Sequence, residues 1–417
     1  MADRTIMEPG RDVPVIREAD VIISGGGPGG VVAAIASARA GADTVLIERY
    51  GFLGGTATAG LMASFNGFRN EIPPMRRQTV KGIAEEIVTE LIRQDGIAER
   101  TAHSRSFQVL EEGCPLQYTV GFDPEVLKYV MLKMAIEAGV EIRLHTYATD
   151  AIVEDNAVKG VFTYSKSGRE AILGKVTVDA TGDADIAASA GAEVLPLNED
   201  RLMGVTMMYR VGNVEPEKFD FQRQPNCIVY KNTAVLWGAG VQGIDCSKTE
   251  DLTKGEIEAR KKTFELIDEL RKTPGFENCF LLEMASHVGV RETRRIRGEY
   301  VVTEEDALDG VQFPDQIAIS SNPVPNYYGE RLYFKHEGFG IPYRALIPKD
   351  IDGLVLAGRC ISCEQVPFQS ARSMAPLMAI SQASGLAAAL AAQMGVQPRD
   401  LDVDQLRSKL LEDGAVF

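Results

Sequence analysis

The feature that most constrains this fold is a glycine-rich turn between a strand and a helix near the N-terminus. Residues 20–24 form a short run rich in Val and Ile, and the pattern G-x-G-x-x-G follows at once. Residues 31–42 are then dominated by Ala, the best helix former, and residues 44–48 are strand-like again. This strand–helix–strand order predicts the opening of a doubly wound parallel sheet.

Each glycine of the pattern has a separate structural task. Gly25 permits a tight turn, Gly27 lets a pyrophosphate approach the backbone, and Gly30 lets the helix pack closely on the strand. The helix N-terminus attracts phosphate, and Glu48 at the end of the next strand can accept hydrogen bonds from ribose hydroxyls. The segment therefore predicts a dinucleotide site, which we favour over a glycine-rich turn without a ligand.

A second match to the same pattern lies at Gly238, Gly240 and Gly243, after the strand-like residues 233–237. The sequence that follows, IDCSKT, cannot open a helix in the way that the Ala-rich segment does. We therefore interpret the second match as a turn in a substrate domain, not as a second dinucleotide site.

Composition excludes several classes of protein. A chain of 417 residues exceeds what one core usually serves, so we expect two domains or one domain with a large insertion. A net charge of −15 argues against a nucleic-acid partner. No apolar run is long enough to predict a membrane span, and the start of the chain lacks a signal-peptide core, so we expect no membrane partner and a cytoplasmic location.

The six cysteines are scattered and match neither a disulfide framework nor a zinc pattern, so we expect no metal. Cys360 and Cys363 form a C-x-x-C pair. We favour two small, semi-buried side chains over a redox pair there, because no thioredoxin-like context surrounds them.

Periodicity predicts the remaining elements. We expect amphipathic or capped helices at residues 78–92, 123–138 and 253–272, and an Ala-rich, nearly all-apolar helix at residues 375–394. Short strands separated by polar turns are expected at residues 140–146, 151–153, 158–164 and 175–178, as in an antiparallel meander, and a buried strand at residues 353–358.

Segments along nearly the whole chain resemble FAD-dependent oxidoreductases of the glutathione-reductase-like and fumarate-reductase-like kind. The matching segments are ADVIISGGGPGG, IERYGFLGGTAT, FDPEVLK, VDATGDADIAASAG, EDLTKGEIEAR, GVRETRRIRGEY, IPYRALIP and LVLAGRCIS. The resemblance implies FAD as cofactor. It also implies an α/β fold: a Rossmann-like FAD-binding domain, with a parallel sheet and an antiparallel meander, carrying an inserted α+β substrate domain. We assign residues 15–65, 115–192 and 345–417 to the FAD-binding domain, and residues 66–114 and 193–344 to the substrate or cap domain.

The resemblance also places cofactor contacts. Residues from Glu48 to Thr56 would follow the ribose and pyrophosphate, Thr181 to Asp183 would return to the phosphate side, and a later Gly-Arg pair would lie beside the ribityl chain. The terminal helix would aim its N–H groups at the pyrimidine edge of the flavin, where a reduced flavin gathers negative charge. The full set of expected cofactor residues is Gly25, Gly27, Pro28, Gly29, Gly30, Glu48, Arg49, Gly54, Gly55, Thr56, Thr181, Gly182, Asp183, Gly358, Arg359, Ala375, Pro376 and Leu377.

Substrate chemistry needs an acid or base and an anchor for a polar group. Of the four histidines, His145 falls in a predicted strand and His103 in a polar stretch, which leaves His336, our first candidate for the acid or base, and His287. Arg291, Tyr343 and Arg344 complete the expected catalytic set, because guanidinium groups suit a substrate carboxylate or a flavin carbonyl. The less favoured interpretation is a satisfied structural histidine and solvated charges.

We therefore expect an enzyme that transfers a hydride between a small organic substrate and N5 of FAD, with an unidentified electron acceptor or donor as partner. Two alternatives stay open: a flavin monooxygenase or oxidase on the same scaffold, and a flavin-binding protein without small-molecule turnover. A homo-oligomer is compatible with the sequence.

Overall fold

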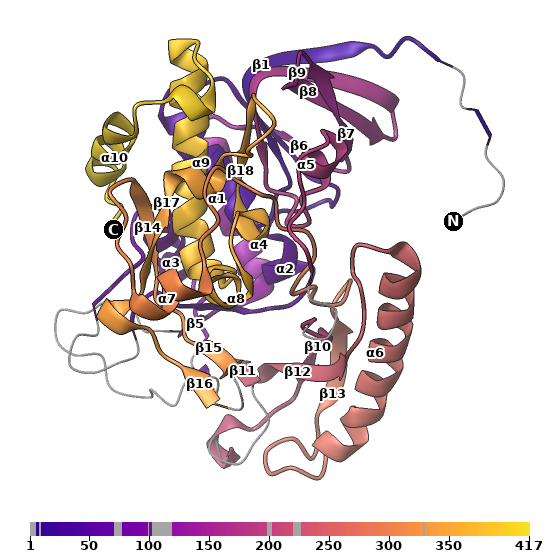
Figure 1. The fold of residues 1–417 in the computed structure, drawn as a ribbon. Helices are drawn as coiled ribbons and strands as arrows, with labels where there is room; N and C mark the ends of the chain where they lie inside the picture. The colour runs from indigo at the N-terminus through magenta and orange to yellow at the C-terminus, as the bar shows by residue number, and fades with distance from the viewer. Residues whose placement is uncertain are drawn as a thin grey trace.

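The computed structural model in Figure 1 describes residues 6–7, 10–70, 77–98, 100–101, 119–197, 202–219, 227–327 and 330–417. His103 and Cys114 lie outside the described residues, as does part of the segment 66–114 that we assign to the cap.

A seven-stranded sheet forms the centre of the molecule. Its parallel part has the order β6-β2-β1-β9, and β18 also pairs with β9 in parallel. These strands are β1 (Val15–Ser24), β2 (Thr44–Ile47), β6 (Glu141–Arg143), β9 (Gly168–Asp179) and β18 (Leu354–Leu356). The doubly wound sheet expected from the glycine motif is confirmed.

The antiparallel meander is continuous with this sheet. Strand β8 (Ala157–Ser165) pairs with β9 on one side and with β7 (Tyr147–Glu154) on the other. We expected only residues 175–178 of β9, but the strand is longer, because residues 168–173 pair with β8 and residues 171–179 pair with β1. β6 is shorter than expected, since the chain turns near His145, whose φ is 53°.

Two Ala-rich helices cross closely beside the parallel strands. They are α1 (Pro28–Arg39) and α9 (Met374–Met394). A Cβ atom on Gly385 would stand 2.0 Å from the carbonyl oxygen of Ala33, so the crossing requires glycine at that position. Helix α9 is long and apolar enough to cross a membrane, but 83% of its apolar window is buried inside the fold. It is therefore a core helix, and the cytoplasmic location stays a prediction.

Two further helices flank this pair. The amphipathic helix α3 (Ile83–Arg93) packs on α1 and α9, and Glu86 on it forms an ion pair of 2.8 Å with Arg39. The side chain of Asp123 caps α4 (Pro124–Glu137), as its position before Pro124 predicts.

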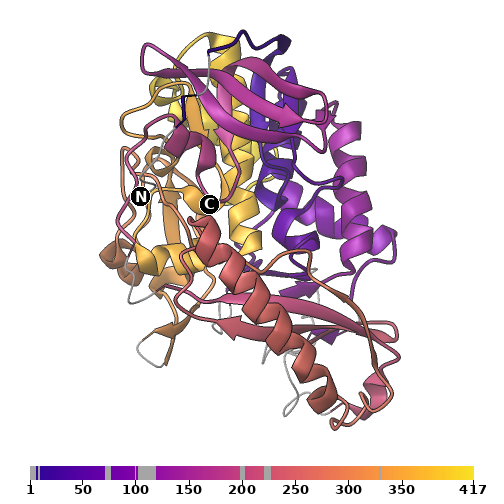
Figure 2. The same ribbon diagram turned by 90° about the vertical axis from the view of Figure 1, so that its right-hand side faces the viewer.

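A second sheet lies below the first in Figures 1 and 2, and the long helix α6 (Thr249–Leu270) runs across it. Its order is β13-β10-β12-β11-β4. The strands are β4 (Arg100–Thr101), β10 (Val205–Gly212), β11 (Cys227–Tyr230), β12 (Thr233–Val241) and β13 (Phe280–Met284). All five strands come from residues 66–114 and 193–344, which we assign to the substrate or cap domain; the domain boundaries themselves stay a prediction.

The second glycine pattern is not the turn that we expected. Gly238 and Gly240 lie inside β12, paired with β10. A Cβ on Gly238 would approach the carbonyl oxygen of Met207 to 2.3 Å, so this glycine permits close packing between neighbouring strands.

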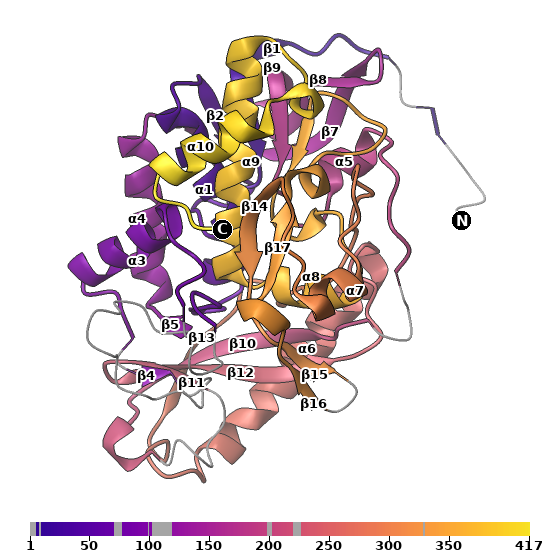
Figure 3. The ribbon, with the colours of Figure 1, turned by 60° about the vertical axis from the view of Figure 1, so that its left-hand side comes forward.

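Short elements complete the fold. They are α2 (Gly55–Thr58), β3 (Ser64–Asn66), β5 (Thr119–Gly121), α5 (Asp185–Ser189), α7 (Glu304–Asp309), β14 (Gln316–Ser320), β15 (Val324–Tyr327), β16 (Glu330–Leu332), β17 (Phe339–Pro342), α8 (Gln365–Ala371) and α10 (Val403–Glu412). Of these, α10 and β14 lie beside α9, as Figure 3 shows.

Candidate functional site

A cavity of about 1140 Å³ lies at the carboxyl ends of the parallel strands and extends to the second sheet. Residues that follow β1, β2, β9 and β18 line it, together with residues of β10, β12 and α8. Open α/β sheets bind ligands at this edge, so the location alone points to a ligand site.

The glycine turn forms one wall of the cavity and leaves room for a phosphate. Gly25 has φ 107°, and a Cβ on Gly30 would stand 1.7 Å from the carbonyl oxygen of Gly25. No atom lies within 4 Å of a Cβ placed on Gly27, which faces open space. The glycines thus have the geometries that a turn, a close approach and a ligand approach require.

The N-terminus of α1 has no side-chain cap, and no acidic residue stands in its first turn. Helix N-termini normally receive a side-chain oxygen, and an uncapped one directed at a cavity is suited to an anion. These residues fit the pyrophosphate of a dinucleotide such as FAD.

Glu48 holds the turn and the next segment in place. Its Oε2 accepts a hydrogen bond of 2.7 Å from the N–H of Gly26, and its Oε1 accepts one of 2.8 Å from the N–H of Tyr50. Burial raises the pKa of this carboxyl. Glu48 also lines the cavity, where its carboxylate can accept further hydrogen bonds from ribose hydroxyls.

Asp183 joins three segments at the phosphate side of the cavity. Its Oδ1 lies 2.8 Å from Nη2 of Arg359 and also accepts a hydrogen bond of 2.8 Å from Thr293. Arg359 donates as well to the carbonyl of Val290, at 2.6 Å. The next residue, Ala184, has φ 58°, an unusual value for alanine that the surrounding contacts hold in place.

Most of the expected cofactor residues line the cavity, and four do not. Gly30 and Gly54 stand behind the turn, where Gly30 contacts Gly25 and Gly54 donates its N–H to the carbonyl of Gly26 at 2.8 Å. Ala375 and Pro376 are buried in the first turn of α9. The residues that line the cavity are Gly25, Gly27, Pro28, Gly29, Glu48, Arg49, Gly55, Thr56, Thr181, Gly182, Asp183, Gly358, Arg359 and Leu377.

Two of the five catalytic candidates also line the cavity. Arg291 is half-buried and donates to the carbonyl of Gly204, and burial lowers its pKa. His287 stacks on Tyr50, with ring centroids 5.9 Å apart. Because Tyr50 is bonded to Glu48, His287 stands near the Glu48 end of the cavity, and burial lowers its pKa, which favours a neutral ring.

The other three candidates, His336, Tyr343 and Arg344, do not line the cavity, which corrects our expectation that they belong to the catalytic set. His336 is exposed on a short turn. Tyr343 is buried and donates to the carbonyl of Pro398 at 2.8 Å. Arg344 is exposed and forms an ion pair of 2.9 Å with Asp315. The segment is tied to β14 through β17, and this pairing carries it past the cavity.

Cys360 and Cys363 are fully buried behind the cavity wall. Burial raises the pKa of both thiols, that of Cys363 to about 12. A redox pair needs accessible thiolate, so the two cysteines are packing residues, as we favoured.

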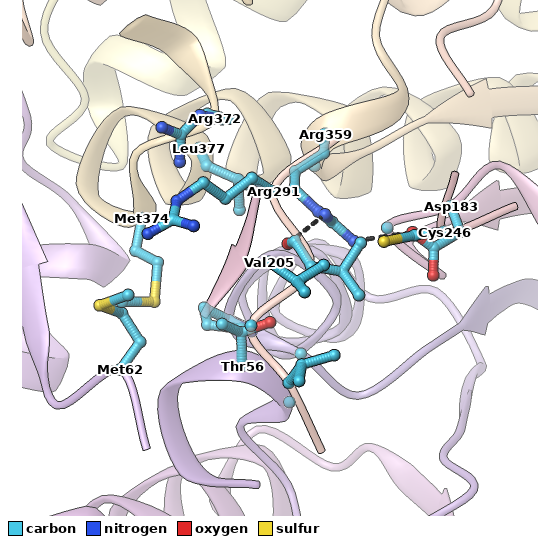
Figure 4. A pocket seen from close by; sticks show the side chains of 18 of the residues that line it. Thr56, Met62, Asp183, Val205, Cys246, Arg291, Arg359, Arg372, Met374 and Leu377 are labelled. Atoms are coloured by element: carbon cyan, nitrogen blue, oxygen red, sulfur yellow. Dashed lines mark hydrogen bonds and ion pairs between the residues drawn. The ribbon is translucent and has the colours of Figure 1, made fainter. Parts of the chain in front are cut away.

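Sequence reasoning missed one wall of the cavity, which α8 and the residue after it provide. Gln365, Gln369 and Arg372 line it, at the spacing i, i+4, i+7 that places side chains on one helical face. That spacing is visible in the sequence QVPFQSAR and was the available signal. Figure 4 shows Arg372 beside Leu377 and Arg291 in this part of the cavity.

Comparison with known proteins agrees with the geometry. The model of the family described as FAD dependent oxidoreductase matches residues 20–225 and 217–410. Digeranylgeranylglycerophospholipid reductase 1 of Methanopyrus kandleri is 29% identical over 252 residues, which cover 55% of this chain and 60% of that protein. This chain spans 40–60% of the length of the first curated reductases that it matches.

Solved flavoenzymes share the fold over nearly the whole chain. A geranylgeranyl bacteriochlorophyll reductase-like protein from Thermoplasma acidophilum has a TM-score of 0.50 at 16% identity, covering 95% of this chain and 83% of that one. The p-nitrophenol 4-monooxygenase of Pseudomonas putida has a TM-score of 0.54 at 12% identity, covering 96% and 87%. At such identities the likeness concerns the fold alone.

Proposed function

The chain belongs to the family of FAD-dependent oxidoreductases, and from this premise we propose that it is a dehydrogenase or reductase that transfers a hydride between a small organic substrate and N5 of FAD. The observation that carries the proposal is the continuity of one cavity. Its wall includes the Gly25–Gly29 turn, the N-terminus of α9, and residues of the second sheet such as Trp237. The glycine turn fits a dinucleotide, and the rest of the cavity offers room for a substrate.

The first turn of α9 supports this division. Ser373, Met374 and Leu377 line the cavity, the N-terminus has no side-chain cap, and its first turn contains no acidic residue. Bound FAD would supply the hydride chemistry, and the N–H groups of this helix would stabilise negative charge on the ring system. The side chains around the far end of the cavity would orient the substrate and exclude water.

Anaerobic reduction of the bound flavin tests the proposal. The purified protein is mixed with alcohols, amines, hydroxy acids and sugars in turn, and the flavin absorbance is followed. We expect one of these classes to bleach the oxidised flavin. If the enzyme works in the reductive direction, we expect instead that an unsaturated compound of one class reoxidises the chemically reduced flavin. A flavin that responds to no donor and no acceptor would contradict turnover and favour a flavin-binding protein.

Oxygen uptake separates the remaining alternative. A monooxygenase or oxidase would consume oxygen in proportion to hydroxylated product or peroxide, whereas the proposed enzyme passes its electrons to another acceptor or takes them from another donor. Stoichiometric coupling of oxygen to product would contradict the dehydrogenase or reductase assignment while leaving the FAD chemistry intact.

A further inference from the structure

Four arginines line the same cavity, and among the residues that the structure describes only Arg359 has an ion-pair partner. Arg49 lies over the ring of Tyr50, 5.0 Å from its centroid, at the Glu48 end of the cavity. Arg359 is paired with Asp183 at 2.8 Å. Arg291 donates to a backbone carbonyl and forms no described ion pair. The side chain of Arg372 has no described hydrogen bond or ion pair, and its Nε is buried without a partner.

The surroundings of Arg372 oppose its positive charge. Its pKa is lowered to about 9, first by burial and then by Arg291 and Arg359. Glu292 raises the pKa of Arg372, but its effect is the smallest of those named. Its carboxylate already accepts a hydrogen bond of 2.8 Å from Gln365 and lies 3.5 Å from Arg295. Unpaired buried charge is costly, so this arrangement is incomplete without an anion.

Arg372 is not among the side chains nearest to the glycine turn. Gly29 of the turn contacts α9 at Leu377 and Ser381, because a Cβ on Gly29 would stand 2.9 Å and 2.7 Å from those side chains. Arg372 precedes the N-cap of α9 and so lies more than a turn before Leu377 along the chain. The uncapped N-terminus of α1 would serve the FAD phosphates, and we assign the charges of Arg291 and Arg372 to another group.

The neighbours of the two arginines describe that group. Figure 4 shows Arg291 and Arg372 on the same side of the cavity as the thioether side chains of Met62 and Met374. The amide of Gln369 lines the same cavity from α8. Guanidinium groups hold carboxylates in a fork, and methionine adapts to apolar groups of varied shape.

We infer that the substrate is a small organic acid whose carboxylate binds between Arg291 and Arg372, while its apolar part packs against Met62 and Met374. The inference rests on the proposed function, because it assigns the substrate end of the same cavity. The two arginines are positioning residues: they hold the carboxylate so that the rest of the substrate faces the flavin.

Binding of simple carboxylates to the FAD-loaded protein tests the inference. Succinate and benzoate are titrated at constant ionic strength, with flavin absorbance and calorimetry as readouts, and succinamide and benzamide serve as uncharged controls. We expect at least one carboxylate to bind saturably and its amide to bind at least tenfold more weakly, because the amide lacks the charge that the two guanidinium groups need.

Variants then locate the carboxylate. Arg372→Gln and Arg291→Gln are each expected to raise the Kd for the carboxylate at least tenfold, and Arg372→Lys, which keeps the charge without the fork, less. Arg344→Gln is the matched control, since Arg344 carries the same charge outside the cavity and is expected to leave the Kd unchanged. FAD content is measured in every variant.

Three outcomes would overturn the inference. If the wild-type protein holds FAD but binds neither carboxylate more tightly than its amide, the substrate is not an organic acid held at these arginines, and the proposed function is unaffected. Unchanged carboxylate Kd in Arg372→Gln, with a shifted flavin midpoint potential, would make the flavin itself the anion that Arg372 serves. Failure of the wild-type protein to bind FAD at all would remove the proposed function and this inference together.

Discussion

Nη2 of Arg359 lies 2.8 Å from Oδ1 of Asp183, and this ion pair joins two segments that are 176 residues apart. One segment follows β9 and the other follows β18, which are neighbours in the parallel sheet. Thr293 donates to the same oxygen. The carboxylate therefore fixes three parts of the cavity wall at once, and its removal should weaken cofactor binding.

Asp183→Asn should weaken FAD binding about tenfold, because a charge-assisted hydrogen bond becomes a neutral one and Arg359 loses its counter-charge. The FAD Kd is measured by fluorescence titration of the apoprotein. Asp150→Asn is the matched control, since Asp150 on β7 pairs with Arg169 on β9 and does not line the cavity. Equal FAD affinity in the two variants would show that the Asp183 pair is only structural.

The second and third glycines of the turn should respond differently to replacement by valine. Gly27→Val should leave a folded protein that binds no FAD: the backbone of Gly27, at φ −69° and ψ 179°, suits any residue, but its new side chain would occupy the open space meant for phosphate. Gly30→Val should unfold the protein, because its Cβ would meet the carbonyl oxygen of Gly25 at 1.7 Å.

Flavin absorbance after purification and the thermal unfolding temperature separate the two effects. Full FAD content in Gly27→Val would place the phosphates elsewhere. A Gly30→Val protein as stable as the wild type would mean that helix α1 can move away from the turn.

The parts of this fold that follow from local pattern were predictable from the sequence. The glycine turn, Glu48 and the cap at Asp123 have tasks that depend on a few neighbouring residues, and each stands where its pattern predicts. The helix at residues 375–394 was equally clear, since a nearly all-apolar, Ala-rich helix of a globular fold is buried on most of its faces.

The substrate end of the cavity was not predictable in this way. We expected His336 there by elimination among the histidines, but the pairing of β14 with β17 carries its segment past the cavity. Arg372 is brought to the cavity by the packing of α8, a contact between distant segments that leaves only the weak helical spacing of Gln365 and Gln369 as a signal. Tertiary pairing decided both positions.

His336→Ala and Arg344→Ala should therefore leave flavin reduction by the substrate within about twofold of the wild type. His336 is exposed, and Arg344 is bonded to Asp315, so neither side chain reaches the cavity. Stopped-flow measurement of the reductive half-reaction provides the rates. A loss of 10²–10⁴-fold in His336→Ala, the usual contribution of a general acid or base, would show that the turn moves into the site when substrate binds.

Asp179 should make the protein less stable as pH rises from about 4 to 6. The side chain is fully buried, and burial raises its pKa to about 6, although Thr181 and the N–H of Ala187 donate to it at 2.7 Å and 2.8 Å. In the unfolded chain an aspartate titrates near pH 3.9. Between these values the folded state holds a proton that the unfolded state has released, so stability falls as pH increases through this window and is then constant.

Asp179→Asn removes this titration, and the difference between wild type and variant isolates it from all other groups. From the raised pKa of Asp179, we expect the stability of the wild type relative to the variant to fall by about 1 kcal/mol between pH 5 and pH 7. The free energy of unfolding is measured by urea titration at both pH values with a fixed excess of FAD. A difference of the opposite sign would mean that the donated hydrogen bonds outweigh burial and hold Asp179 ionised in the folded protein.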